Sequence, residues 1–565
     1  MGVEKLAKKI RTPLFIIITV EILGVIFLVL GVFPREVALF LLGIFVFFIL
    51  FSPLKQGLLF TAFSIPLFTA VPLSESFDEM AAWRIVVTIL FLKAALNLSG
   101  SRSVARADGL RRFVIGTIRT WRYFVVQLLK TRIGVFVCLF FLTATLSLFV
   151  ATDPIFGIRK LAYLANALGL FFVVWMIAKT KKDFLDIVQY TFGGVIAVLL
   201  VGYAQFIAVH FAPLHAFWQW WASHVIPVFY GANLSHLLSY SNTWFSYYEE
   251  AEATLRVFSI FPDSHSFALS MVLALPVALT FFAMSESRHE ARFLFGAFVF
   301  LALLAVVFSG TRGVWVGAVP VFFVVALVFL IQNSAFRKNF PIVTSIITRV
   351  ITPKLDGFRR NTTKTCVLVF FVFALLFPVA SQIQKISQWR QGGEISDTTT
   401  FSRIYTSFRT EELSNKGRIQ IWKSTLESVV KHPFLGVGIG NYPVVLSESI
   451  SATKEGASAH SLYLDFVAEI GVFGGIVVLL IFLEIFRKAI RVFIQGEDLF
   501  FIVFSGFFAV FLLWVMAYSA VDVVLLNDKV LLLFVTLLGL LYAIPKERVL
   551  IKKYVNSFHN NRGEK

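Results

Sequence analysis

The chain has 565 residues, of which 58% are hydrophobic and only 15% are charged, and its mean hydropathy is +0.82. A soluble globular protein has roughly 25% charged residues, so the surplus of apolar side chains excludes an ordinary soluble fold and requires lipid. The net charge of +18 would suit nucleic acid, but the basic residues cluster in short connections between apolar runs, as the positive-inside rule produces. We therefore expect an all-α, polytopic integral membrane protein whose partners include membrane lipids and no nucleic acid.

Apolar runs recur along the chain at the length of about 20 residues that a membrane-spanning helix needs. The first run, 13–33, follows a basic start that resembles a secretory signal, but it is too long and no cleavage site follows, so we expect it to be retained. About fourteen transmembrane helices are expected. They are 13–33, 35–51, 54–72, 82–98, 133–151, 159–178, 189–210, 265–284, 291–309, 313–331, 365–381, 461–486, 499–519 and 529–545.

The charges of the connections predict the orientation. Segment 99–132 carries eight Lys or Arg against one Asp, and 332–364 carries seven against one, whereas 211–264 has only Arg256. Positive charge marks the cytoplasmic side. Both termini are therefore expected in the cytoplasm, and 211–264 and 382–460 outside it.

The same pattern divides the chain. We expect N-terminal membrane helices (1–98), a basic cytoplasmic connection (99–132), central membrane helices (133–381) that include the outer loop 211–264 and the basic loop 332–364, a large extracytoplasmic loop (382–460), and C-terminal membrane helices with a basic tail (461–565).

The two long outer segments are patterned. Segment 211–264 is rich in Trp, Tyr and His, which favours an interfacial helix because amphipathic aromatic rings prefer the headgroup level. Segment 382–460 contains "GRIQIWKSTLESVVKHPF", which predicts an amphipathic helix that ends at the following Pro and Gly. Its apolar residues at helical spacing are Ile419, Trp422, Leu426 and Val429 or Val430.

Three arginines lie on the expected outer side: Arg256, Arg312 and Arg418. Each has a structural alternative. Arg312 suits a turn arginine that snorkels to headgroups, and Arg418 at a helix start opposes the helix dipole unless an anion lies nearby. Arg256 has possible ion-pair partners in Glu249, Glu250 and Glu252. Because the planar guanidinium binds phosphate in a bidentate way, a cluster of the three would suit a lipid-linked phosphate or diphosphate.

His460 stands where the polar loop becomes a hydrophobic helix, and Asp465 and Glu469 follow on one face of that helix. The histidine is either an ordinary interfacial residue or a general base, which one of the carboxylates would orient. Glu21 and Asp522 also lie within or beside apolar runs, without neighbours that indicate a role. The "GVGIGN" run lacks the spacing of a dinucleotide fingerprint and predicts a tight loop.

Four ordered motifs resemble the O-antigen ligase and O-antigen polymerase superfamily, the ligase-polymerase enzymes of bacterial envelope polysaccharides. They are "RVFSIFPDSHSFAL" (256–269), "SGTRG" (309–313), "GRIQIWKSTLESVVKHPFLGVGIGNY" (417–442) and "AHSLYLDFVAEIGVFGG" (459–475). The resemblance covers about 255–490 and implies a GT-C-like, metal-independent, inverting glycosyltransferase without a cofactor.

The resemblance also implies the substrates and the site. The donor would be a lipid-linked oligosaccharide on undecaprenyl diphosphate, and the acceptor a hydroxyl of a glycolipid, glycan or protein, outside the bacterial inner membrane. Arg256, Arg312 and Arg418 would bind the donor diphosphate. His460 and Glu469 would be catalytic, with His265 and Asp465 as secondary candidates and no metal ligands.

The chain departs from the family pattern at three places. Ser461 stands where Asn normally follows the histidine, Ser259 replaces a Gly, and Ser264 with His265 replaces a Pro-Asn pair. The motifs do not encode the acceptor, so a polymerase or a protein O-oligosaccharyltransferase stays open beside the ligase. A transporter or flippase is a further alternative, although it would need polar groups near the membrane midplane.

Overall fold

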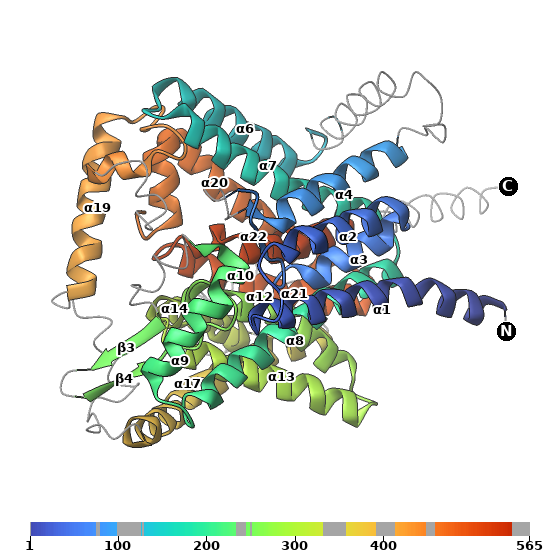
Figure 1. Ribbon diagram of the computed structural model, residues 1–565. Helices are drawn as coiled ribbons and strands as arrows, with labels where there is room; N and C mark the ends of the chain where they lie inside the picture. The colour runs from blue at the N-terminus through green and yellow to red at the C-terminus, as the bar shows by residue number, and fades with distance from the viewer. Residues whose placement is uncertain are drawn as a thin grey trace.

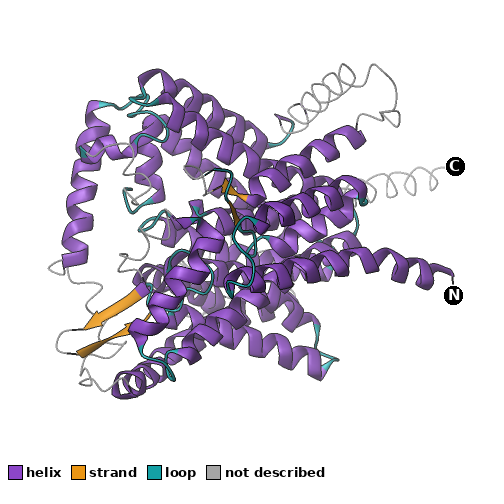
Figure 2. Cartoon of the chain, viewed as in Figure 1, coloured by secondary structure: helices purple, strands orange, loops and turns teal. Residues whose placement is uncertain are grey.

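The structure, a computed structural model, describes residues 2–74, 80–98, 126, 129–232, 244–248, 251–331, 357–390, 413–447 and 458–544. Helices dominate this part of the chain (Figure 2). The helices of the first half are α1 (Gly2–Val29), α2 (Val37–Phe51), α3 (Leu54–Ser64), α4 (Ala82–Leu98), α6 (Arg132–Leu146), α7 (Pro154–Ile177), α8 (Lys181–Ala208), α9 (Leu214–Trp220) and α10 (Ile226–Tyr230). Those of the second half are α12 (Ser264–Met284), α13 (His289–Phe308), α14 (Arg312–Ile331), α17 (Gly357–Arg390), α19 (Leu413–Lys431), α20 (Leu462–Gln495), α21 (Leu499–Ser519) and α22 (Asp528–Ala543).

Short elements complete the described chain. Antiparallel pairs form between β1 (Ala70–Val71) and β2 (Met80–Ala81) and between β3 (Phe245–Tyr248) and β4 (Ala251–Leu255). The 3₁₀ segments are η1 (Ser147–Val150), η4 (Tyr442–Leu446) and η6 (Val524–Leu526), and η2 (Trp221–Val225) is a π-helical turn.

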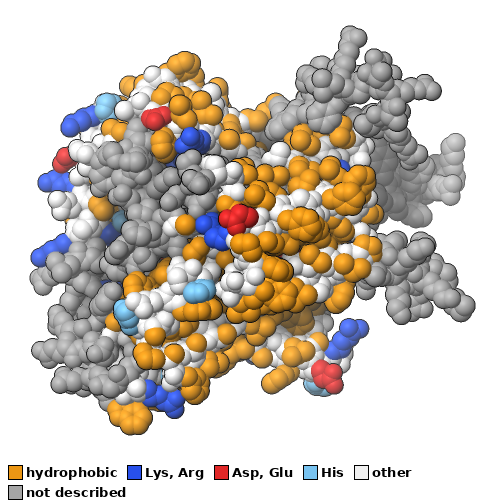
Figure 3. All heavy atoms as spheres, in the orientation of Figure 1, with side chains coloured by type: hydrophobic (Ala, Val, Ile, Leu, Met, Phe, Trp, Pro, Cys, Tyr) orange, Lys and Arg blue, Asp and Glu red, His pale blue; other side chains and the backbone are white. Residues whose placement is uncertain are grey.

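The all-α membrane class is confirmed. Nine of the described helices are long and apolar enough to cross a membrane, and α2 and the apolar part of α1 are shorter. Large hydrophobic side chains such as Phe15, Phe40 and Phe293 are exposed, which lipid accounts for and water does not. On the face that Figure 3 shows, hydrophobic side chains cover most of the middle of the molecule. The number of fourteen spans stays a prediction.

The predicted span 54–72 is shorter in the structure, because α3 ends at Ser64. Pro66 disfavours the helical conformation of the residue before it, so the helix cannot continue. The chain then turns and reaches β1. Three other helix starts carry polar caps that match their sequences: Asp153 caps α7, Ser461 caps α20 and Asp498 caps α21.

The long helices run side by side across the view in Figure 1, and α19 and the β3–β4 hairpin lie at the end opposite to the start of α1. We call this the loop-rich end; it comprises 256–263, 309–311, 458–461 and 520–527 with α19 and the hairpin. α12 packs against α13 and α21, and α20 packs against α21 and α6. These contacts bring the starts of α12, α14 and α20 and the end of α21 to the loop-rich end.

The two patterned loops differ in part from expectation. Segment 211–264 contains helices α9 and α10, but it also contains the β3–β4 hairpin, which the prediction of an interfacial helix missed. α17 continues nine residues beyond 381, so the large loop begins later than predicted.

The amphipathic helix is present as α19 and ends before Pro433, as its sequence predicts. Its apolar residues divide between two faces. Trp422 is half-buried, whereas Ile419, Leu426 and Val430 are exposed.

Candidate functional site

Asp522, in the loop between α21 and α22, is the buried centre of a polar cluster at the loop-rich end. Its Oδ2 accepts hydrogen bonds from His265 Nδ1 at 2.7 Å and from the Tyr518 hydroxyl at 2.9 Å, and its Oδ1 accepts from the backbone N–H of Val523 at 2.8 Å. Its backbone carbonyl accepts from Leu462 N at 3.3 Å. Asp522 therefore ties together the starts of α12 and α20 and the end of α21.

Charge keeps Asp522 ionised despite its burial. Burial raises the pKa of this carboxyl, but the charge and hydrogen bond of His265, the charge of Arg418 and the Tyr518 hydroxyl together hold the pKa at about 2. A carboxylate can only accept, so His265 Nδ1 must carry the hydrogen that it donates.

His460 is held in a strained backbone conformation directly before α20. Its φ is +46°, a left-handed conformation that residues other than glycine rarely adopt. The preceding residue, Ala459, is fixed on both sides: its N–H donates to Asp465 Oδ1 at 3.1 Å, and its carbonyl accepts from Trp422 Nε1 at 2.9 Å. Such strain persists where the surrounding contacts determine the backbone, and it is typical of functional positions.

The environment of His460 favours its neutral form. Burial lowers the pKa of the imidazole, the positive charges of Arg418 and His265 lower it further, and Asp522 and Asp465 oppose them in part. The net pKa lies below the ordinary value of 6.5. At neutral pH the ring is therefore unprotonated and able to accept a proton.

Arg256 lies against the "SGTRG" turn. Its Nε donates to Ser246 Oγ at 3.2 Å, and a Cβ added to Gly310 would lie 3.1 Å from Arg256 Cγ. Gly310 has φ +63° and so combines a turn with a close approach that a larger residue would prevent. The backbone N–H of Val257 donates to the Phe308 carbonyl at 3.1 Å. The first two predicted motifs thus form one surface.

Arg312 is the first residue of α14 and adjoins the Asp522 cluster through its neighbours. Thr311 Oγ1 lies 3.5 Å from Ser264 Oγ, next to His265, and a Cβ added to Gly313 would lie 2.8 Å from the Tyr518 ring. The alternative partners of Arg256, the side chains of Glu249, Glu250 and Glu252, lie outside the described residues.

Arg418 reaches the same cluster from α19. Its Nη1 donates to the Val521 carbonyl at 3.3 Å, and its charge acts on both His460 and Asp522. The helix begins at Leu413, so Arg418 is not at its first turn as predicted. The dipole argument for a nearby anion therefore does not apply, although the charge of Arg418 does act on Asp522. The structure thus places His265 and Arg418 at one carboxylate whose charge also acts on His460, and the segments that carry Arg256 and Arg312 adjoin this cluster.

Asp465 and Glu469 lie on one face of α20 as predicted, but that face meets α7. Lys160 Nζ lies 2.6 Å from Glu469 Oε2 and 3.6 Å from Asp465 Oδ2, and 5.4 Å from the centre of the Phe466 ring. Asp465 acts on the His460 region through the backbone of Ala459. Both carboxylates pair with a cation, and the charge of Asp465 also raises the pKa of His460, so the expectation that one of them orients the imidazole stays a prediction.

The "GVGIGN" run is a tight loop, as predicted, and it closes a break in α20. Ile470 and Gly471 have non-helical dihedrals, which frees carbonyls of the preceding turn. Val437 N donates to the Ala468 carbonyl at 2.9 Å and Gly438 N to the Glu469 carbonyl at 3.0 Å. Buried backbone groups need such partners, so the loop has a structural role.

Two departures from the family pattern have physical explanations. Ser259 has φ +53°, which explains a glycine at this position in the pattern, and it is held by hydrogen bonds from its N–H to Gln205 Oε1 at 3.0 Å and from its hydroxyl to the Val198 carbonyl at 2.7 Å. Ser461 is the N-cap of α20 and its hydroxyl accepts from Leu464 N. Serine and asparagine are both good N-caps, so Ser461 preserves the helix start.

The sequence reasoning missed Asp522 as the centre of the site and Lys160 as the partner of Glu469. A single carboxylate directly after an apolar run was the available signal for Asp522. Within the described ranges no group of three or more His, Cys, Asp or Glu side chains is arranged to hold a metal ion.

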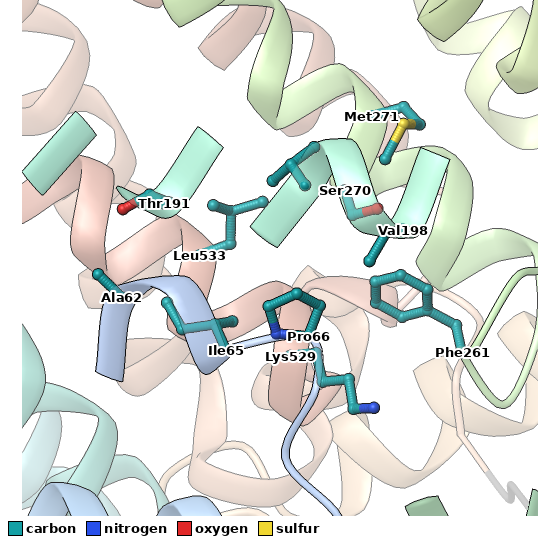
Figure 4. A pocket seen from close by; sticks show the side chains of 11 residues that line it. Ala62, Ile65, Pro66, Thr191, Val198, Phe261, Ser270, Met271, Lys529 and Leu533 are labelled. Carbon is teal, nitrogen blue, oxygen red and sulfur yellow. The ribbon is translucent and has the colours of Figure 1, made fainter. Parts of the chain in front are cut away.

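An enclosed cavity lies behind the cluster, between α3, α8, α12 and α22 (Figure 4). Its volume of about 10 Å³ suits one water molecule and excludes a sugar or a phosphate. Lys529 lines it, with Nζ 4.2 Å from the centre of the Phe229 ring. The cavity is therefore not a substrate site.

Comparison with known proteins agrees with the motifs. Residues 297–479 match the family model for O-antigen ligases, which includes the "SGTRG" turn, Arg418, His460 and Glu469. The match is narrower than the predicted 255–490 and leaves out Arg256, His265 and Asp522. No curated protein matches the chain. The match supports the resemblance read from the motifs over this segment, and the long apolar helices support a multi-pass membrane protein.

Proposed function

Because residues 297–479 match the family model for O-antigen ligases, we propose that the chain is a ligase-type membrane glycosyltransferase. It transfers a glycan from an undecaprenyl-diphosphate-linked donor to an acceptor hydroxyl at the extracytoplasmic surface. The observation that carries the proposal is the meeting of His265, His460 and Arg418 with Asp522, beside the segments that carry Arg256 and Arg312. The loop-rich end is then the extracytoplasmic end, which agrees with the basic connections predicted for the cytoplasmic side.

In the proposed reaction the acceptor oxygen attacks the anomeric carbon of the donor sugar, and the bond from that carbon to the phosphate oxygen breaks. The hydroxyl proton passes to His460, whose neutral form the low pKa supports. Direct displacement on one face inverts the anomeric carbon. Undecaprenyl diphosphate is the leaving group, and the negative charge that develops on its phosphate oxygen must be stabilised.

Arg256 and Arg312 are proposed to bind this diphosphate. They belong to adjoining segments, which the Val257–Phe308 hydrogen bond and the close approach of Arg256 to Gly310 hold together. Two such cations can provide the charge stabilisation that a divalent metal supplies in other transferases. Arg418, which is tied to the Val521 carbonyl, is proposed to act mainly through its charge on His460 and Asp522.

The two carboxylates of α20 take different roles in this proposal. Asp465 positions the segment that carries His460, and Glu469 stabilises the helix through Lys160. His265, oriented by Asp522, is proposed to bind the acceptor hydroxyl.

The test is transfer in vitro from a synthetic undecaprenyl-diphosphate oligosaccharide, with purified full-length protein and with and without a chelator. We expect activity that survives chelation and is lost in His460→Ala. Activity that disappears with the chelator, or that is unchanged in His460→Ala, would contradict the mechanism. Deletion of the gene then separates the acceptors: surface glycan of normal chain length that is no longer attached supports a ligase, and shortened chains support a polymerase.

A further inference from the structure

We propose that Lys160, on α7, is a positioning residue for the reaction: it holds the first turns of α20 so that His460 faces the acceptor. The inference rests on the proposed function, because it concerns the same site. Lys160 belongs to the helices before the family match, whose role the sequence did not assign.

The first step is the buried ion pair itself. The side chains of Glu469 and Asp465 are 2% and 6% exposed, and that of Lys160 is 21% exposed. Two carboxylates one helical turn apart repel each other in such a place, and burying either without a cation is strongly unfavourable. Lys160 Nζ, at 2.6 Å from Glu469 and 3.6 Å from Asp465, neutralises this repulsion.

The second step leads from the ion pair to the histidine. Asp465 uses Oδ2 toward Lys160 and Oδ1 to accept the N–H of Ala459 at 3.1 Å. Ala459 directly precedes His460, whose left-handed backbone depends on its surroundings. Without Lys160, the charge of Asp465 would draw it toward water and release the Ala459 hydrogen bond. His460 would then relax from its φ of +46° and move its imidazole.

The third step concerns the anchoring of α7. Asn441 Oδ1 accepts from Asp153 N at 2.8 Å, and Asn441 Nδ2 donates to the Asp153 carbonyl at 3.1 Å. Gly438, in the same loop, donates to the Glu469 carbonyl. The loop 436–441 thus fastens the start of α7 to α20, and Lys160 lies two turns into α7. Because α7 is anchored in this way, Lys160 can hold α20 in position in addition to neutralising its carboxylates.

The experiment measures two quantities on full-length protein in detergent. The first is kcat and KM for a synthetic undecaprenyl-diphosphate oligosaccharide. The second is the pH dependence of His460 carbethoxylation by diethyl pyrocarbonate, followed by mass spectrometry, which needs no activity. In Lys160→Met we expect kcat to fall by about 10²-fold, as misplacement of a catalytic group by an ångström produces, with KM unchanged and a shifted His460 labelling profile. Lys160→Arg, which keeps the charge, restores most of the rate.

Two further variants separate positioning from folding. Lys160→Met combined with Glu469→Gln removes the pair without leaving Glu469 charged, so the protein folds better while its kcat stays low. Lys93→Met is the matched control, because the Lys93 ammonium also joins two helices, but by donating to the carbonyls of Ile49, Leu50 and Ser52 away from the site. It is expected to leave kcat and His460 labelling unchanged.

The outcomes are distinct. Wild-type kcat and wild-type His460 labelling in Lys160→Met would overturn the inference. So would a loss of kcat without a change in labelling that Lys160→Arg fails to restore, since that indicates lost packing alone. If the wild-type protein transfers no glycan, the proposed function fails, and the labelling of His460 still decides whether Lys160 positions it.

Discussion

Two polar regions near the start of α20 differ in their surroundings. One is the segment directly before the helix, and the other lies two turns into it. Directly before the helix, His460 belongs to a cluster with Asp522, His265 and Arg418. Two turns on, Glu469 lies against α7 and the 436–441 loop, in contact with Lys160. The first region has a strained backbone and an imidazole whose pKa is lowered, and the second has a buried ion pair.

The difference shows what a helical spacing can and cannot tell. Asp465 and Glu469 share a face of α20, as their spacing requires. What that face contacts cannot be read from the spacing, because its neighbour is α7, a helix distant in sequence. The polar cluster at the loop-rich end is formed by several chain segments that meet there. One of them, the segment with His460, directly precedes α20, and the Glu469–Lys160 ion pair stabilises that helix.

The largest effect is expected from the arginines of the polar cluster. Arg256→Gln or Arg312→Gln removes a cation from the proposed diphosphate site, and we expect kcat/KM to fall by about 10²- to 10³-fold, the usual effect of removing one group that stabilises developing charge. The measurement is transfer from the synthetic lipid-linked donor. Arg159→Gln is the control: Arg159 is exposed and contacts the Phe156 ring. Equal losses in all three variants would argue against a diphosphate site.

A smaller loss is expected when the centre of the cluster is changed. Asp522→Asn keeps the shape of the side chain but removes the charge that orients His265 through Nδ1. We expect a decrease in kcat of about 10- to 100-fold, the effect of losing an orienting partner. Asp498→Asn, at the opposite end of α21, caps that helix and pairs with Lys181, and it should leave kcat unchanged. A fully active Asp522→Asn enzyme would show that His265 needs no orientation.

Much of the fold was predictable because lipid imposes a simple pattern. Runs of about 20 apolar residues gave the helices directly. The exceptions have local causes that hydropathy does not register: Pro66 shortens α3, and the β3–β4 hairpin follows from strand pairing in an aromatic segment. For α19 the spacing predicted a helix but not which apolar residues would face the protein, since that depends on what it packs against.

For the site, the sequence predicted which residues are unusual and the structure determined their partners. His460, Arg256, Arg312 and Arg418 were predicted because polar residues are expensive beside a membrane. Asp522 and Lys160 lie far from these residues in sequence, and their roles depend on tertiary contacts at 2.7 Å and 2.6 Å. The family pattern has glycine where this chain has Ser259. Only the structure explains this, through the positive φ of Ser259 and its hydrogen bond to Gln205.

The smallest effect, and the most diagnostic of the comparison, is expected from Arg418→Gln. The charged groups that act on His460 are Arg418 and His265, which lower its pKa, and Asp522 and Asp465, which raise it. Removing the Arg418 charge therefore raises the pKa of His460. A general base works in its unprotonated form, so the ascending limb of kcat/KM against pH moves to higher pH, with little change in the plateau. The matched variant Lys423→Gln, on the exposed side of α19, should leave the limb in place. A limb that moves to lower pH in Arg418→Gln, or that moves equally in both variants, would contradict the assignment of His460 as the base.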